Sequence, residues 1–196
     1  MRNGAAARVV VALLLLAGAR PSLALDMEAL EQKVVLCAAC HGAKGISTNP
    51  AVPSLAGQPK QFITTQLVMF REGNRKDPQM SSIAAGIGNA DINDFGTYFA
   101  AQVPVPPAAS SMDPGKVASS QRLAEQYHCV SCHGAALKGQ QHIPRLAGQQ
   151  AAYLAAQLRG FKAGTRFDMD GNMTSAAQPL TESDIELLAE YLAALR

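Results

Sequence analysis

One pentapeptide occurs twice in this chain of 196 residues, and it limits what the chain can fold into. The two copies are Cys37-x-x-Cys40-His41 and Cys129-x-x-Cys132-His133. This spacing is the attachment signature of a c-type haem, because two thiols three residues apart can form thioethers and the next imidazole can ligate the iron. The sequence therefore predicts two covalently bound haem c groups, each with a histidine as one axial ligand.

Two other chemistries use a C-x-x-C pair. A redox disulfide and half of a zinc site both contain it. A dithiol motif needs no histidine directly after it, and zinc-binding pairs usually lie closer together in a small module. The doubled motif therefore favours haem over both alternatives.

The first 24 residues have the pattern of a secretory signal. Arg2 and Arg8 give a basic start, residues 9–17 are apolar, and Ser22-Leu23-Ala24 fits a cleavage site between small residues. The apolar stretch is too short to span a bilayer, although an uncleaved anchor is the alternative. We expect cleavage after Ala24 and export to a bacterial periplasm.

The net charge of the whole chain is +2, but much of the positive charge lies in the signal. Removing Arg2, Arg8 and Arg20 leaves 14 basic against 15 acidic side chains. No basic field for nucleic acid or anionic lipid remains. We expect no nucleic-acid partner, and membrane association only through a partner protein.

The two halves align at an offset of 91 to 93 residues, which indicates one domain duplicated. Proline recurs in the segment between them, so this segment cannot be a helix or a central strand. At roughly 3 Å per residue in polyproline form it would extend about 30 Å. We predict an N-terminal domain over residues 25–102, a Pro-rich linker over 103–112 and a C-terminal domain over 113–196.

The apolar positions predict an all-α fold. Asp26 is placed to cap a helix that runs into the first motif, and Asp113-Pro114 is an N-cap followed by proline for its counterpart. The middle helix of each half ends at a glycine suited to a C-cap, Gly73 or Gly164. The closing helices show helical spacing of inward-facing residues: Ile92, Phe95, Phe99, Ile185, Leu188, Leu192 and Leu195. No segment shows convincing strand alternation.

Methionine is the candidate for the second axial ligand of each iron. Met80 follows the first motif histidine by 39 residues, and Met173 follows the second by 40. Each stands 11 residues before the aspartate of a closing helix. Met169 is close enough to compete with Met173, but its equivalent in the first half is not methionine.

A Pro-x-Leu-x-Gly segment follows each motif. The carbonyl groups of Pro53 and Pro144 are candidates to accept a hydrogen bond from the motif histidines, which would fix the orientation of each ring. The leucines of these segments would pack on the haem faces: Leu55 and Leu146. The alternative is a plain turn with one buried leucine.

Several polar residues have both a functional and an ordinary explanation. Arg75 and Arg166 recur at equivalent positions and could pair with haem propionates or remain solvated charges at helix ends. His128 and His142 have no counterpart in the first half, so we interpret them as ordinary histidines.

The sequence resembles the cytochrome c4 family of dihaem periplasmic cytochromes. The motifs that carry the resemblance occur twice: C-x-x-C-H-G, P-x-L-A-G-Q, F-x-x-G-x-R, and M-[ST]-S before a D-I helix. The resemblance implies two tandem class I cytochrome c domains related by a pseudo-twofold, with haems near the interface and His/Met ligation. It implies an electron carrier, without a substrate of its own, that serves a terminal oxidase, a quinol-oxidising complex or another periplasmic redox partner.

Two other functions remain open from the sequence. One is the dihaem cytochrome subunit of a larger oxidoreductase, such as a sulfide-oxidising flavocytochrome. The other is a peroxidase or gas sensor, which needs an open iron position, whereas this chain offers a methionine for each iron. The second half departs from the family pattern at residues 135–139 and 167–172, so its axial methionine is less securely assigned.

Overall fold

The computed structural model describes Met1, residues 27–106 and residues 112–196. Over these residues the chain is helical, with one isolated β-bridge between Gln140 and Ile143 and no strand, so the predicted all-α class is confirmed. The expected signal peptide, the Asp26 cap and part of the linker lie outside the described residues. None of the described helices is long and apolar enough to cross a membrane.

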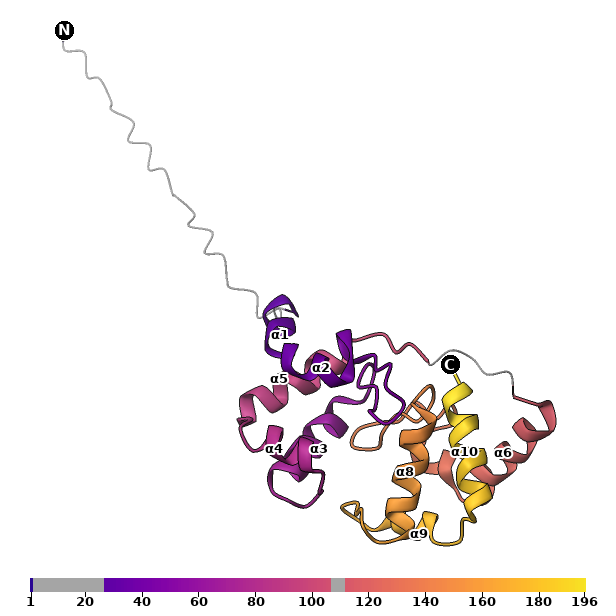
Figure 1. Ribbon diagram of the computed structural model, residues 1–196. Coiled ribbons are helices and arrows are strands. Elements are labelled where there is room, and N and C mark those ends of the chain that lie inside the picture. Colours follow the sequence, from indigo (N-terminus) through magenta and orange to yellow (C-terminus); the bar gives the residue numbers. More distant parts are fainter. Residues whose placement is uncertain (2–26, 107–111) are drawn as a thin grey trace.

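The two halves lie side by side, and the described linker residues 103–106 pass across their boundary (Figure 1). The first half contains α1 (Met27–Lys33), α2 (Val35–His41), the 3-10 turn η1 (Ala43–Gly45), α3 (Lys60–Arg71), α4 (Pro78–Ala84) and α5 (Asn89–Ala100). The second half contains α6 (Pro114–Gln126), α7 (Cys129–His133), α8 (Ala151–Lys162), α9 (Asn172–Ala177) and α10 (Glu182–Ala194).

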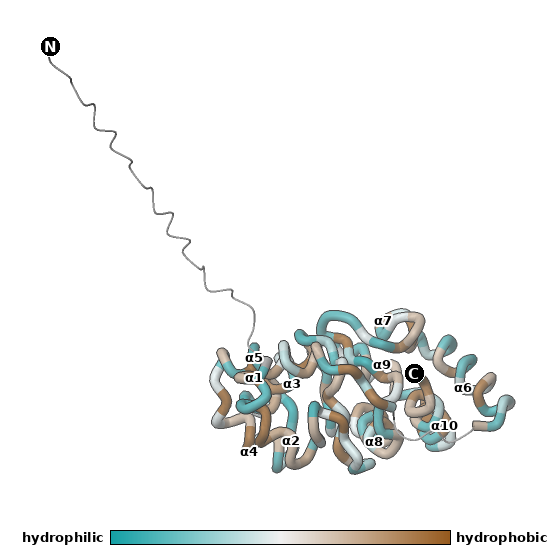
Figure 2. Tube along the Cα trace, turned by 90° about the horizontal axis from the view of Figure 1, so that it is seen from above, coloured by the Kyte–Doolittle hydropathy of each residue, from teal (hydrophilic) through white to brown (hydrophobic). Residues whose placement is uncertain are grey.

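Each half buries its own hydrophobic core, as expected for a duplicated domain. The two clusters of buried residues are separate, and hydrophobic stretches occur along the chain in both halves (Figure 2). The first core is built from Leu30, Val34, Ile63, Phe95, Tyr98 and Phe99. The second is larger and includes Leu154, Phe161, Ile185, Leu188, Tyr191 and Leu192. The motif cysteines Cys37 and Cys129 pack against these cores.

The predicted helix ends are present. The Asp113 carboxylate accepts hydrogen bonds from two amides of the first turn of α6 at 2.8 and 3.2 Å. Thr181 and Asp184 form a reciprocal capping box at the start of α10. Gly73 and Gly164 follow α3 and α8 with φ values of +75° and +66°, which only glycine adopts readily.

The helix that was expected to run into the first motif is broken. Val34 separates α1 from α2 with φ −88° and ψ 3°, because its buried side chain belongs to the core while the chain turns toward the motif. In the second half the break falls at His128, whose backbone is left-handed at φ 57°. Each motif therefore lies in a new short helix, α2 or α7.

The closing helix of each half crosses the middle helix at close range. A Cβ atom added to Gly96 would come within 2.7 Å of the Thr64 side chain on α3. The equivalent residue of α10 is Ala189, which is 1% exposed where α10 packs on α8. These small residues allow the closing helix to pack closely on the middle helix in each half, α5 on α3 and α10 on α8.

Two short helices were not predicted from the sequence. They are α4, which packs on α3 and carries Met80, and α9, which packs on α8 and carries Met173. Segments of six or seven residues give little periodic signal, and their stability comes from packing and capping.

Candidate haem sites

The two motif histidines have the same environment. His41 is 7% exposed and His133 is 4% exposed. In each ring, Nδ1–H donates to a proline carbonyl at 2.8 Å, that of Pro53 or Pro144. A carbonyl can only accept, so the proton lies on Nδ1 and the lone pair of Nε2 remains available. Both predicted hydrogen bonds are therefore present.

Burial also favours the neutral ring. Loss of hydration lowers the pKa of His41 and of His133, and this outweighs the carbonyl bond, which raises it. A neutral imidazole with one tethered nitrogen is the form that ligates a metal. The histidines thus fit the role of an iron ligand.

The motif thiols differ within each pair. Cys37 and Cys129 are partly buried, whereas Cys40 and Cys132 are exposed. Burial raises the pKa of the Cys37 thiol and of the Cys129 thiol, the reverse of the lowered pKa that activates a dithiol oxidoreductase. In the described parts of the chain, no three His, Cys, Asp or Glu side chains gather into a zinc-type cluster. The environment fits thiols that are attached to an apolar body.

The Pro-x-Leu segments are held by equivalent backbone bonds. Leu55 N donates to Gly45 O at 2.7 Å, and Leu146 N donates to Leu137 O at 2.8 Å. Leu55 packs against the same core as Cys37, and Leu146 against the same core as Cys129. Each half therefore brings its histidine, proline, leucine and first cysteine together.

The candidate methionine ligands lie on the separate helices α4 and α9. Met80 and Met173 are both partly buried, and Met173 packs against the second core. Met169 is 75% exposed and lines an open groove of about 650 Å³ together with Phe167 and residues of α3. Met173 is therefore less exposed than its competitor, and a thioether that packs against a core has less conformational freedom than an exposed one.

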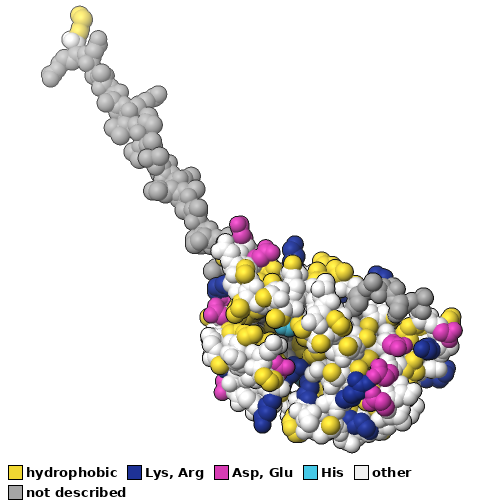
Figure 3. Space-filling model, in the orientation of Figure 1, with side chains coloured by type: hydrophobic (Ala, Val, Ile, Leu, Met, Phe, Trp, Pro, Cys, Tyr) yellow, Lys and Arg dark blue, Asp and Glu magenta, His cyan; other side chains and the backbone are white. Residues whose placement is uncertain are grey.

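The surface has a hollow suited to an apolar group. In the space-filling view, hydrophobic side chains surround a recess in which a histidine side chain is visible (Figure 3). The 650 Å³ groove is a different feature, because no histidine lines it.

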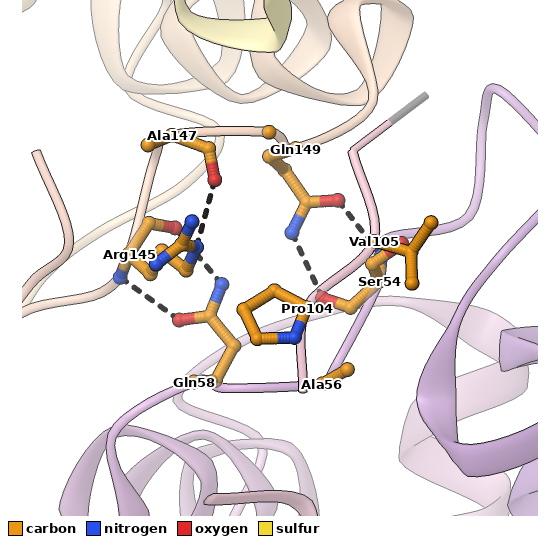
Figure 4. A pocket seen from close by; sticks show the side chains of 9 residues that line it. Ser54, Ala56, Gln58, Pro104, Val105, Arg145, Ala147 and Gln149 are labelled. Carbon is orange, nitrogen blue, oxygen red and sulfur yellow. Dashed lines mark hydrogen bonds between the residues drawn. The ribbon is translucent and has the colours of Figure 1, made fainter. Parts of the chain in front are cut away.

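A pair of buried glutamines joins the two halves (Figure 4). The Gln149 amide accepts from Ser54 N at 2.8 Å and donates to Ser54 O at 2.9 Å. The Gln58 amide does the same with Arg145, with both distances 2.9 Å. Each glutamine therefore pairs with the Pro-x-Leu segment of the other half, which relates the halves by a pseudo-twofold.

Two backbone hydrogen bonds between the halves obey the same pseudo-twofold, but the side chains at these two positions differ. Phe62 N donates to Gln141 O, and Tyr153 N donates to Pro50 O, both at 3.1 Å. Phe62 and Tyr153 occupy equivalent positions, so only the second half supplies a hydroxyl there.

That hydroxyl lies between two arginines. Arg75 Nη2 donates to Tyr153 Oη at 3.0 Å, and Arg75 and Arg166 each stack 4.5 Å from a phenylalanine ring of their own half. Burial lowers the pKa of Arg166 to about 10, and its Nε has no hydrogen-bond partner among the residues that the structure describes. Burial alone would raise the pKa of Tyr153, but the two positive charges leave it lowered. These arginines are thus interface residues and not freely solvated charges.

Comparison with known proteins agrees with this architecture. The cytochrome c family profile matches residues 117–196. Cytochrome c4 of Pseudomonas aeruginosa is 34% identical over 185 residues, which cover 87% of this chain and 89% of that protein. The crystal structure of reduced recombinant cytochrome c4 from Pseudomonas stutzeri superposes with a TM-score of 0.80 at 32% identity, covering 87% of this chain and 99% of that one.

The chain belongs to the cytochrome c4 family. It is therefore an electron-transfer cytochrome with covalently bound haem c, and it works with redox partners. A thiosulfate dehydrogenase electron acceptor of Thiomonas intermedia is also similar, at 35% identity over 169 residues, which cover 81% of this chain and 77% of that protein. The two tandem class I cytochrome c domains predicted from the sequence are confirmed at the level of the fold.

The sequence did not reveal the interface residues. Gln58 and Gln149 were part of the repeated P-x-L-A-G-Q motif, so their recurrence was visible. Their partners lie in the other half, which no local pattern indicates. The sequence pointed to the Tyr153 hydroxyl only through one difference between the copies, because the equivalent residue of the first half is Phe62.

Proposed function

We propose that this cytochrome c4 carries two haems that pass single electrons between periplasmic redox proteins. One haem would be attached to Cys37 and Cys40 with His41 and Met80 as ligands, and the other to Cys129 and Cys132 with His133 and Met173. The observation that carries the proposal is the buried, carbonyl-tethered imidazole directly after each C-x-x-C pair.

The chain's own residues would make the electron transfer rapid. When bound, the haem supplies an iron that changes oxidation state by one electron. Pro53 and Pro144 hold the imidazoles in one orientation. Leu55 and Leu146, which pack against the two cores, would exclude water from the bound haems. A thioether as second ligand favours the reduced state and leaves no iron position open to a substrate.

The cellular setting follows from the family and the amino-terminal pattern. We propose cleavage after Ala24 and a periplasmic location, with domains over residues 25–102 and 113–196 joined by the linker at 103–112. The acceptor would be a terminal oxidase, and the donor a quinol-oxidising complex or another respiratory protein.

A second partner is favoured by one comparison. Similarity to a thiosulfate dehydrogenase electron acceptor suggests that this chain accepts electrons from a thiosulfate-oxidising enzyme. Stopped-flow reduction of the oxidised protein by a purified thiosulfate dehydrogenase tests this. Reduction no faster than with an unrelated cytochrome would exclude this partner, and reduction by a flavoprotein subunit would favour the oxidoreductase-subunit alternative.

The ligation is tested by spectroscopy. A pyridine haemochrome assay should give two haems per chain, and the reduced spectrum should not change on addition of carbon monoxide. Replacing Met80 or Met173 with alanine should lower the midpoint potential of one haem only and allow carbon monoxide to bind there. Carbon monoxide binding to the unmodified protein would instead support the peroxidase or sensor alternative.

A further inference from the structure

An aspartate holds the backbone of each candidate methionine ligand. Asp77 Oδ1 accepts a hydrogen bond from Met80 N at 2.9 Å, and Asp168 Oδ2 accepts one from Met173 N at 2.9 Å. The two aspartates occupy equivalent positions, 91 residues apart. In both halves, therefore, an aspartate carboxylate accepts a hydrogen bond from the amide of the equivalent methionine.

The contact persists although the sequence between the two residues differs. Met80 is the third residue after Asp77, whereas Met173 is the fifth residue after Asp168. In the first half Asp77 is the N-cap of α4, with proline at the next position. In the second half the N-cap of α9 is Gly171, which has no side chain to contribute, and the aspartate reaches across the longer loop. The equivalent aspartate is therefore the N-cap residue in one half only, but in both halves it accepts a hydrogen bond from the amide of the candidate methionine.

The carboxylate matters because the helices are short. An isolated helix of six or seven residues is unstable in water, and α4 and α9 are each supported mainly by one neighbouring helix. A hydrogen bond from an amide to a carboxylate is charge-assisted and stronger than a neutral one. Methionine has a flexible side chain, so its position depends on the backbone that carries it.

We infer that Asp77 and Asp168 are positioning residues that hold Met80 and Met173 in the conformation that ligates iron. This rests on the proposed His/Met ligation. The second half depends more on its aspartate, because Asp168 has no neighbouring N-cap side chain to replace it, whereas proline stiffens the turn after Asp77. Asp168 is also close enough to Arg166 to raise the pKa of that arginine electrostatically.

The test measures how easily an external ligand displaces the methionine. Imidazole is titrated into the oxidised holoprotein, and the weak long-wavelength band of sulfur-bound ferric iron is followed. Asp77→Ala and Asp168→Ala should each raise the imidazole affinity of one iron about tenfold, equivalent to about 1.4 kcal/mol. The effect of Asp168→Ala should be the larger. Asparagine variants, which keep an acceptor oxygen, should stay within about threefold of the unmodified protein.

The chain contains a matched control. Asp113-Pro114 caps α6 in the same way as Asp77-Pro78 caps α4, but α6 carries no candidate ligand. Asp113→Ala should lower the melting temperature without changing imidazole affinity. If Asp77→Ala does not accumulate, Asp77→Gly tests the same point, since glycine is a tolerated N-cap that lacks the oxygen. Asp168 precedes the N-cap Gly171, so Asp168→Ala removes the carboxylate without changing the N-cap residue of α9.

The outcomes separate this inference from the ligation on which it rests. Imidazole affinities of the aspartate variants equal to that of Asp113→Ala would show that the aspartates only stabilise the fold, and would overturn the inference. Met80→Ala and Met173→Ala should each remove half of the long-wavelength band. If they leave the band intact, it is the proposed ligation that fails.

Discussion

Gln149 is the residue whose removal should most clearly separate the two halves. It is 5% exposed, and its amide holds Ser54 N and Ser54 O at 2.8 and 2.9 Å. Its oxygen also accepts from Gln150 N at 3.0 Å. Gln149→Ala therefore leaves three buried backbone groups without their partner.

The size of the effect follows from these bonds. A buried group that loses its only partner costs about 1–3 kcal/mol. A cavity of about 10 Å³ already adjoins this site, and the space vacated by the side chain would enlarge it enough to admit a water molecule. Water would restore some of the lost bonds, so we expect a net loss of about 2–4 kcal/mol. Gln58→Ala breaks two hydrogen bonds instead of three and should cost less.

Denaturation of the holoprotein by guanidinium chloride measures this loss. The two haems report on their own halves through the Soret band, and circular dichroism reports on the helices. We expect a lower midpoint for Gln149→Ala and a broadening into two steps, because the halves no longer stabilise each other. Gln121→Ala, on the exposed face of α6, is the control. A loss below about 0.5 kcal/mol, typical of such a surface site, would refute the reasoning.

Two further predictions concern stability. Tyr153→Phe should cost about 1–2 kcal/mol in chemical denaturation, because Arg75 loses a hydrogen-bond acceptor at the interface, while Phe62 shows that the ring itself is tolerated there; an unchanged midpoint would contradict this. Asp184→Asn should lower the melting temperature by about 1–4 °C at pH 7. Hydrogen bonds from Thr181 lower the pKa of Asp184 in the folded state, so the stabilisation is present above the unfolded pKa and is lost as pH falls through the folded value. The difference between the two proteins should therefore begin to shrink as pH falls below about 4 and disappear once pH is below the lowered folded pKa, and a constant difference would disprove the assignment.

The sequence determined the chemistry and the main helices. A C-x-x-C-H motif contains the two thiols and the imidazole for haem attachment within five residues, so it can be recognised from the sequence alone. The cap at Asp113 likewise acts over three residues or fewer, and it is where the sequence predicted it. The proline carbonyls were found because the duplication repeats the Pro-x-Leu segment shortly after each motif, with Pro53 12 residues after His41 and Pro144 11 residues after His133.

The tertiary structure alone decided how the two copies meet. Gln149 and Ser54 are 95 residues apart in sequence, so no local pattern shows that they are paired. The difference in exposure between Met169 and Met173 is likewise visible only in the tertiary structure. Packing brings together groups whose interactions cannot be read from spacing, and for that reason the interface and the support of the methionines became visible only in the folded chain.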